Sequence, residues 1–140
     1  MKRATLLLAD DHPAVLDHLI DMLSQDFDIV GALGDGLAAY EAATMLRPDA
    51  VVFDISMPVL TGLEAAARLA TSAQPPCVVF LTVHQDRDFV EAAFNAGALG
   101  YVLKNRLATD LIPAIHEALA GRTFVSAPLL FEAPVRTPAS

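Results

Sequence analysis

The chain has 140 residues, of which 54% are hydrophobic, and it carries a formal net charge of −8. A chain of this length forms one domain and buries about two-thirds of its unfolded surface in a single core. The acidic balance argues against a broad basic surface that grips nucleic acid or an anionic membrane, and it favours basic partners.

The N-terminus begins with two basic residues and a short apolar segment, as a signal peptide does. Asp10 ends this segment well short of the roughly 7 to 15 residues of a signal core, and no later run approaches the roughly 18 of a membrane span. Cys77 is the single cysteine, so there is no intramolecular disulfide, and we expect it in the core. The predicted location is cytoplasmic, away from any membrane.

Five short apolar runs alternate with five segments of helical pattern. The runs cover 5–9, 29–33, 49–53, 77–81 and 99–103, and the helical segments cover about 13–23, 37–46, 61–71, 86–96 and 109–120. Apolar runs without polar alternation are typical of buried parallel strands, which are joined by right-handed crossovers. We therefore predict an α/β fold with a doubly wound, five-stranded parallel sheet and helices on both faces.

Local signals mark several helix ends. Thr61 and Glu64 fit a capping box, and Gly97 and Gly121 stop the fourth and fifth helices. Pro113 falls inside the last predicted helix, where a proline usually costs about 3 kcal/mol. We expect either a late start, near residue 109, or a slight kink.

Polar residues stand at the carboxyl ends of four predicted strands. They are Asp10 and Asp11 after the first strand, Asp54 after the third, Thr82 after the fourth and Lys104 after the fifth. In an open α/β sheet these ends form one rim, where ligands bind. Each residue alone is better explained as a cap, a turn residue or a solvated charge. Their coincidence at one edge indicates a site.

The crowded acids of this rim need a cation. Two carboxylates about 4 Å apart repel by roughly 4 kcal/mol at an effective dielectric of about 20. Mg²⁺, or Mn²⁺ in its place, takes oxygen ligands such as Asp10, Asp11 and Asp54. A carboxylate beside the ion can attack a phosphoryl group, while Thr82 and Lys104 donate to the transferred oxygens. The rim therefore predicts an aspartyl-phosphate site.

These motifs, in their order and spacing, resemble the receiver domains of two-component response regulators over about residues 5–126. They are Asp10-Asp11, Asp54 with Met57-Pro58 and Gly62, Thr82, and Gly100-Tyr101-Val102-Leu103-Lys104. The resemblance implies a flavodoxin-like sheet of order 2-1-3-4-5 and a signalling domain that is not an enzyme. It also implies that Asp54 accepts the phosphoryl group from the histidine of a sensor kinase, with Asp10 and Asp11 as metal carboxylates.

The same resemblance implies roles for other rim residues. The Ser56 carbonyl is a further metal ligand, and Lys104 and Thr82 contact the phosphoryl group. Tyr101 looks like the family's aromatic switch, which moves inward with Thr82 and alters the surface of the fourth helix, fifth strand and fifth helix; the alternative is a half-exposed strand tyrosine. Ser56 and His84 stand where the family tunes phosphoryl loss, although a rim histidine is more often merely solvated.

The other histidines, at positions 12, 18 and 116, show no ligand spacing, and we assign them no role.

Residues 10–13 and 120–126 resemble the branch of the family whose receivers precede an output domain of the NarL/FixJ type. We predict a receiver domain over 1–126 and a Pro/Ala-rich tail or linker over 127–140. Within it, Leu129-Leu130-Phe131 could start a linker helix, pack on the receiver or help a dimer form on phosphorylation.

Several functions remain open. The chain is either the regulatory part of a transcription factor, without direct nucleic acid binding of its own, or a natural single-domain regulator that acts by protein contacts. A receiver used only for docking is a third option. A haloacid-dehalogenase-type phosphatase would need a second acid where Ser56 stands, and a flavodoxin-like cofactor binder would not place Asp10 and Asp11 against a phosphate.

Overall fold

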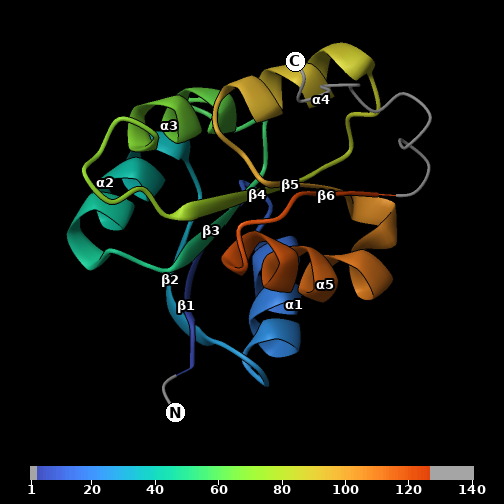
Figure 1. Ribbon diagram of the computed structural model, residues 1–140. Helices are drawn as coiled ribbons and strands as arrows, with labels where there is room; N and C mark the ends of the chain where they lie inside the picture. The colour runs from blue at the N-terminus through green and yellow to red at the C-terminus, as the bar shows by residue number, and fades with distance from the viewer. Residues whose placement is uncertain (1–2, 127–140) are drawn as a thin grey trace.

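The computed structural model describes residues 3–126, which form a parallel sheet between two layers of helices (Figure 1). The elements are β1 (Thr5–Ala9), α1 (Pro13–Leu23), β2 (Asp28–Leu33), α2 (Gly36–Leu46), β3 (Ala50–Phe53), α3 (Gly62–Leu69), β4 (Cys77–Thr82), α4 (Arg87–Asn95), β5 (Gly100–Leu103), a 3₁₀ turn (Lys104–Arg106), α5 (Leu107–Leu119) and β6 (Phe124–Val125). The sheet order is β2-β1-β3-β4-β5-β6. The predicted order 2-1-3-4-5 and the doubly wound fold are therefore confirmed.

The helices cover both faces of the sheet, with α1 and α5 on one side and α2, α3 and α4 on the other (Figure 1). Neighbouring strand residues point to opposite faces. Leu7 and Phe53 pack into the core beside α2, α3 and α4, whereas Leu8 and Val52 pack into the core beside α1 and α5. This two-sided burial explains why the central strands read as unbroken apolar runs.

Two features of the C-terminal part differ from the prediction. A short sixth strand, β6, pairs in parallel with β5, with Phe124 opposite Gly100 and Val125 opposite Tyr101; two residues are too few to show a sequence period. The predicted late start of the last helix was wrong, because α5 begins at Leu107 and continues through Pro113 to Leu119. Burial of its apolar face against the sheet outweighs the local cost of the proline.

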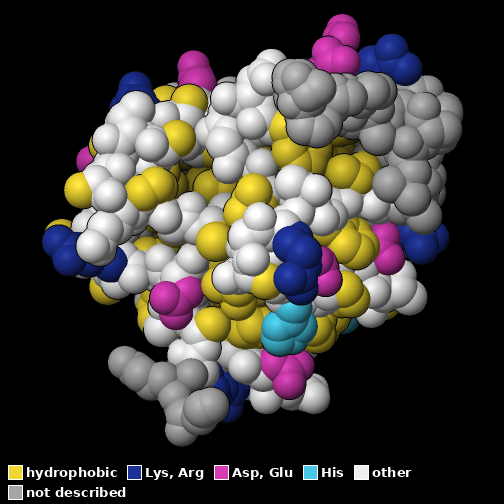
Figure 2. Space-filling view, viewed as in Figure 1, with side chains coloured by type: hydrophobic (Ala, Val, Ile, Leu, Met, Phe, Trp, Pro, Cys, Tyr) yellow, Lys and Arg dark blue, Asp and Glu magenta, His cyan; other side chains and the backbone are white. Residues whose placement is uncertain are grey.

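Several smaller expectations concern individual segments. Cys77 is only partly buried, and its thiol donates to the Ala118 carbonyl at 3.2 Å. The predicted tail 127–140, including Leu129-Leu130-Phe131, lies outside the described residues. Within residues 3–126, none of the helices combines the length and apolarity needed to cross a membrane. On the face drawn in Figure 2, basic side chains are scattered among acidic ones and form no broad basic surface.

Val59→Gly is expected to raise the free energy of unfolding by roughly 0.5–1 kcal/mol. Val59 is β-branched and 74% exposed, yet it has a φ of 72° in the loop before α3. The left-handed backbone costs such a residue about 1–2 kcal/mol, and glycine relieves this strain while adding freedom to the unfolded chain. Equilibrium denaturation in urea measures the change.

A second exposed valine provides the control for this variant. Val83 is 66% exposed and does not have a positive φ. Val83→Gly should therefore lower the free energy of unfolding, because it adds freedom to the unfolded chain without relieving strain. If both substitutions changed the free energy of unfolding in the same direction, the result would contradict backbone strain at Val59.

Candidate functional site

Two buried acids lie side by side because β1 and β3 are neighbours in the sheet. Ala9 is paired with Phe53 at the carboxyl ends of these strands, so Asp10 and Asp54 follow together. The Asp54 amide donates to the Ala9 carbonyl at 3.0 Å, and the Asp10 amide donates to the Leu33 carbonyl at 3.1 Å. Asp10 is 2% exposed and Asp54 is 5% exposed. The sheet thus holds both carboxylates at the rim with little contact with water.

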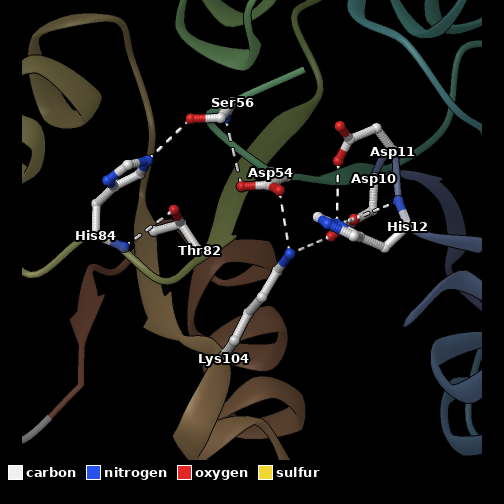
Figure 3. A network of polar contacts seen from close by, with 8 residues as sticks. All are labelled: Asp10, Asp11, His12, Asp54, Ser56, Thr82, His84 and Lys104. Atoms are coloured by element: carbon white, nitrogen blue, oxygen red, sulfur yellow. Dashed lines mark hydrogen bonds and ion pairs between the residues drawn. The ribbon is translucent and has the colours of Figure 1, made fainter. Parts of the chain in front are cut away.

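Lys104 brings a cation to these two acids from the end of β5. Its Nζ lies 2.7 Å from Asp10 Oδ2 and 3.1 Å from Asp54 Oδ2 (Figure 3). Burial alone would lower the pKa of Lys104, but the hydrogen bonds and charges of Asp10 and Asp54 outweigh it and raise that pKa above its usual value. The side chain is therefore an ammonium at neutral pH, shared by the two carboxylates.

Four side chains at this rim could share one metal ion. They are Asp10, Asp11, His12 and Asp54, whose ligand atoms all lie within 4.8 Å of one another. The three carboxylates supply the hard oxygen donors that suit Mg²⁺, so the predicted acidic cluster fits that ion. No role was predicted for His12, yet its ring lies over Asp10 and Asp11 (Figure 3). His18 and His116 are not members of this group.

The loop after Asp54 is held tightly by the start of α3. The Gly62 amide donates to the Ile55 carbonyl at 2.8 Å, and a Cβ on Gly62 would lie 2.0 Å from the Asp54 carbonyl oxygen. Thr61 and Glu64 form the predicted capping box, with hydrogen bonds of 2.9 and 3.1 Å. Only glycine allows α3 to begin this close to the backbone of Asp54.

A second group of polar side chains lies beside Asp54 on the β4 side. Ser56 Oγ lies 2.9 Å from His84 Nε2, and the Ser56 amide is 3.4 Å from Asp54 Oδ1 (Figure 3). The His84 ring stacks on Phe89 with centroids 4.1 Å apart, and the His84 amide donates to Thr82 Oγ1 at 3.3 Å. His84 is thus half-buried and bonded within the rim, not merely solvated.

Tyr101 is completely buried and not half-exposed. Its hydroxyl donates to the His84 carbonyl at 2.8 Å. Burial, followed by the negative charges of Asp86 and Asp54, raises the pKa of Tyr101 far above its usual value. The phenol therefore stays protonated and keeps this hydrogen bond at any physiological pH.

The rim geometry agrees with one protein family. The sequence pattern of the response regulator receiver domain matches residues 6–116. This chain belongs to that family. Receiver domains are signalling domains and not enzymes, they partner with histidine kinases, and the acidic group of Asp10, Asp11 and Asp54 is typical of their Mg²⁺ site. Membership of this family argues against the two other functions considered from the sequence, a haloacid-dehalogenase-type phosphatase and a flavodoxin-like cofactor binder.

Individual relatives of this receiver are transcriptional regulators. The transcriptional regulatory protein PdtaR of Mycobacterium tuberculosis is 40% identical over 116 residues, which cover 82% of this chain and 56% of PdtaR. The nitrate/nitrite response regulator protein NarL of Escherichia coli is 34% identical over 125 residues, 88% of this chain and 58% of NarL. The chain therefore spans little more than half the length of these relatives.

The fold has close counterparts among solved structures. The crystal structure of a two-component response regulator of the LuxR family from Aurantimonas sp. matches with a TM-score of 0.88 at 32% identity, covering 94% of this chain and 95% of that one. The receiver resemblance seen in the sequence is thereby confirmed. Its predicted branch, of the NarL/FixJ type, is supported by relatives that include NarL and a LuxR-family regulator.

Proposed function

We propose that this receiver accepts a phosphoryl group on Asp54 from the histidine of a sensor kinase. A carboxylate oxygen of Asp54 attacks the phosphorus, the bond from phosphorus to the donor nitrogen breaks, and the nitrogen keeps the electron pair. The observation that carries the proposal is the position of Lys104 Nζ, 3.1 Å from Asp54 Oδ2. From there the ammonium can donate to the transferred oxygens while the new bond forms.

The other residues of the rim would bind the metal ion and donate hydrogen bonds to the phosphoryl group. Asp10, Asp11 and the Ser56 carbonyl, together with Asp54, would hold Mg²⁺ or Mn²⁺, which when bound neutralises charge on the phosphoryl oxygens. The Thr82 hydroxyl and Lys104 donate hydrogen bonds to those oxygens. Asp10 and Asp54 are almost fully buried, so these interactions take place where water screens them little.

The same proposal includes the readout of phosphorylation. Thr82 Oγ1 accepts from the His84 amide, and the His84 carbonyl accepts from Tyr101. A movement of Thr82 towards the phosphoryl group therefore reaches Tyr101 through the backbone of one residue, and with it the surface formed by α4, β5 and α5. Ser56 and His84, bonded to each other beside Asp54, are our candidates for setting the phosphoryl lifetime.

We further propose that residues 1–126 are the receiver and that 127–140 are a tail or the start of a linker. The transcriptional regulators among the relatives support a role as the regulatory part of a transcription factor, with dimer formation on phosphorylation and no nucleic acid contact by this chain. A single-domain regulator is the alternative. A reading frame that continues past Ser140 into a helix-turn-helix domain would support the role in a transcription factor. A stop codon directly after Ser140 would support the single-domain regulator.

Incubation with a small acyl phosphate and Mg²⁺ is expected to add one phosphate to the chain, because Asp54 is the only acceptor proposed. Intact-protein mass spectrometry measures this addition. Asp54→Asn should abolish it, and Asp11→Asn should weaken both the labelling and the binding of Mg²⁺. The exposed Asp26, away from the rim, supplies a matched control, since Asp26→Asn should label normally. Labelling that persists in Asp54→Asn would overturn the assignment.

A further inference from the structure

Asp110 is a buried acid that the proposed phosphoryl transfer does not use. It lies in the first turn of α5 and is 6% exposed. Its Oδ2 accepts from the Ser126 hydroxyl at 2.8 Å and from Arg106 Nε at 2.9 Å, and its Oδ1 accepts from the Thr109 hydroxyl at 3.0 Å. A buried carboxylate with this many donors is fixed in one orientation, so it can anchor the residues bonded to it.

Ser126 continues the hydrogen bonding of β5 where the pairing with β6 ends. The last strand pair joins Val125 to Tyr101, and the Ser126 amide still donates to the Tyr101 carbonyl at 3.0 Å. The Leu103 amide then donates to the side-chain oxygen of Ser126, Oγ, at 3.1 Å. Leu103 is 1% exposed and Ser126 is fully buried. Without this hydroxyl, the Leu103 amide would lose its acceptor in a place that water does not reach.

These hydrogen bonds hold the backbone on both sides of Lys104. Lys104 follows Leu103 directly and begins the 3₁₀ turn that ends at Arg106. Asp110 binds Arg106 directly and binds Leu103 through the Ser126 hydroxyl. A lysine side chain is long and flexible, so the position of its backbone decides where its ammonium can reach. Here it reaches two acids of the rim, at 2.7 and 3.1 Å.

We propose that Asp110 and Ser126 are positioning residues for Lys104, which hold the end of β5 so that the ammonium meets the phosphoryl oxygens at Asp54. The inference rests on the proposed transfer to Asp54. Neither residue touches the reacting atoms. Ser126 acts through the Leu103 amide, and Asp110 acts by accepting the Ser126 hydroxyl hydrogen, which leaves the lone pairs of that oxygen for the amide.

The rate of acyl-phosphate labelling with Mg²⁺, followed by intact-protein mass spectrometry, tests the proposal. Ser126→Ala is expected to slow labelling about tenfold, since a misplacement of about 1 Å can cost about 100-fold. Asp110→Asn keeps the shape of the side chain but loses an acceptor oxygen, so it should slow labelling as well and provides the test if Ser126→Ala does not fold. Ser72→Ala is the control, because that exposed hydroxyl donates to the Leu69 carbonyl at the end of α3 away from the rim; it should label at the unaltered rate.

A double-variant comparison separates positioning of Lys104 from a general structural role. In the Lys104→Met background, Ser126→Ala or Asp110→Asn should change the labelling rate by no more than about twofold, because the group that they position is gone. Equal slowing in both backgrounds, or an unaltered rate in the folded single variants, would overturn the positioning roles alone. Labelling that persists in Asp54→Asn would instead overturn the proposed transfer.

Discussion

Gly62→Ala is expected to lose about 3 kcal/mol or more of the free energy of unfolding, a large part of the 5–15 kcal/mol typical of a domain. The added Cβ would lie 2.0 Å from the Asp54 carbonyl oxygen and 3.0 Å from its carbonyl carbon. Both atoms belong to the backbone, so the clash cannot be relieved by a rotamer change. Either α3 or the loop behind Asp54 has to move, and the hydrogen bond from Gly62 to Ile55 is strained with it.

Two measurements test the effect of Gly62→Ala on stability and on the site. Urea denaturation gives the free energy of unfolding, and acyl-phosphate labelling of the folded fraction reports whether Asp54 keeps its position. Gly34→Ala is the matched control, because a Cβ there meets nothing within 4 Å; its expected change is within about 1 kcal/mol. Equal stability of the two variants would show that the contact between Gly62 and Asp54 is not needed.

Lys104→Met is expected to cost about 3 kcal/mol of stability at neutral pH, because it leaves the buried Asp10 and Asp54 carboxylates without their cation. The Lys104 side chain is 15% exposed, so solvent screens this interaction little. Mg²⁺ should stabilise the variant more than it stabilises the unaltered protein, because carboxylate oxygens that Lys104 occupies become available to the ion. Thermal unfolding with and without Mg²⁺ measures both effects.

The pH dependence of this difference follows from the raised pKa of Lys104. A lysine whose folded pKa lies above its unfolded value of 10.5 contributes stability that is fully present below pH 10.5. That contribution is lost as the pH rises through the folded pKa. The gap between the unaltered protein and Lys104→Met should therefore be constant from pH 7 to 9 and shrink above about pH 10.5.

A surface cation serves as the control for the lysine variant. Arg122 pairs with Glu117 at 2.5 Å on an exposed part of the chain. Arg122→Met should leave both the stability and the response to Mg²⁺ unchanged within error, since exposed ion pairs contribute little. A loss as large as that of Lys104→Met would show that removal of any positive charge destabilises this acidic chain.

Much of this receiver is determined by the sequence alone. The two-sided burial of the central strands leaves unbroken apolar runs, and the edge strand β2 is apolar as well, so five of the six strands and the helices between them could be read directly. The strand ends then placed Asp10, Asp54, Thr82 and Lys104 on one rim, because parallel strands end at the same edge. The capping box at Thr61 could also be predicted from the sequence, since its two partners are only three residues apart.

Other features of the protein were decided only by the tertiary structure, because they depend on contacts between residues that are distant in sequence. Tyr101 can be completely buried because its hydroxyl has a partner, the His84 carbonyl, in the loop after β4. The strand β6 and its neighbour Ser126 depend on β5 and α5, since Ser126 Oγ accepts from the Leu103 amide and donates to the buried Asp110 carboxylate at 2.8 Å. Burial opposes ionisation of Asp110, but hydrogen bonds from Arg106, Ser126 and Thr109 outweigh it and lower its pKa.

The same division applies within the acidic site. The sequence places His12 next to Asp10 and Asp11, yet adjacency along a chain does not tell which way a side chain points. The folded backbone decides it, because the β1 ladder holds Asp10 while the start of α1 turns His12 back over both acids. Residue types and strand ends thus predicted which groups share the rim. Only the packed backbone, through long-range hydrogen bonds, set the distances that decide what each group can bind.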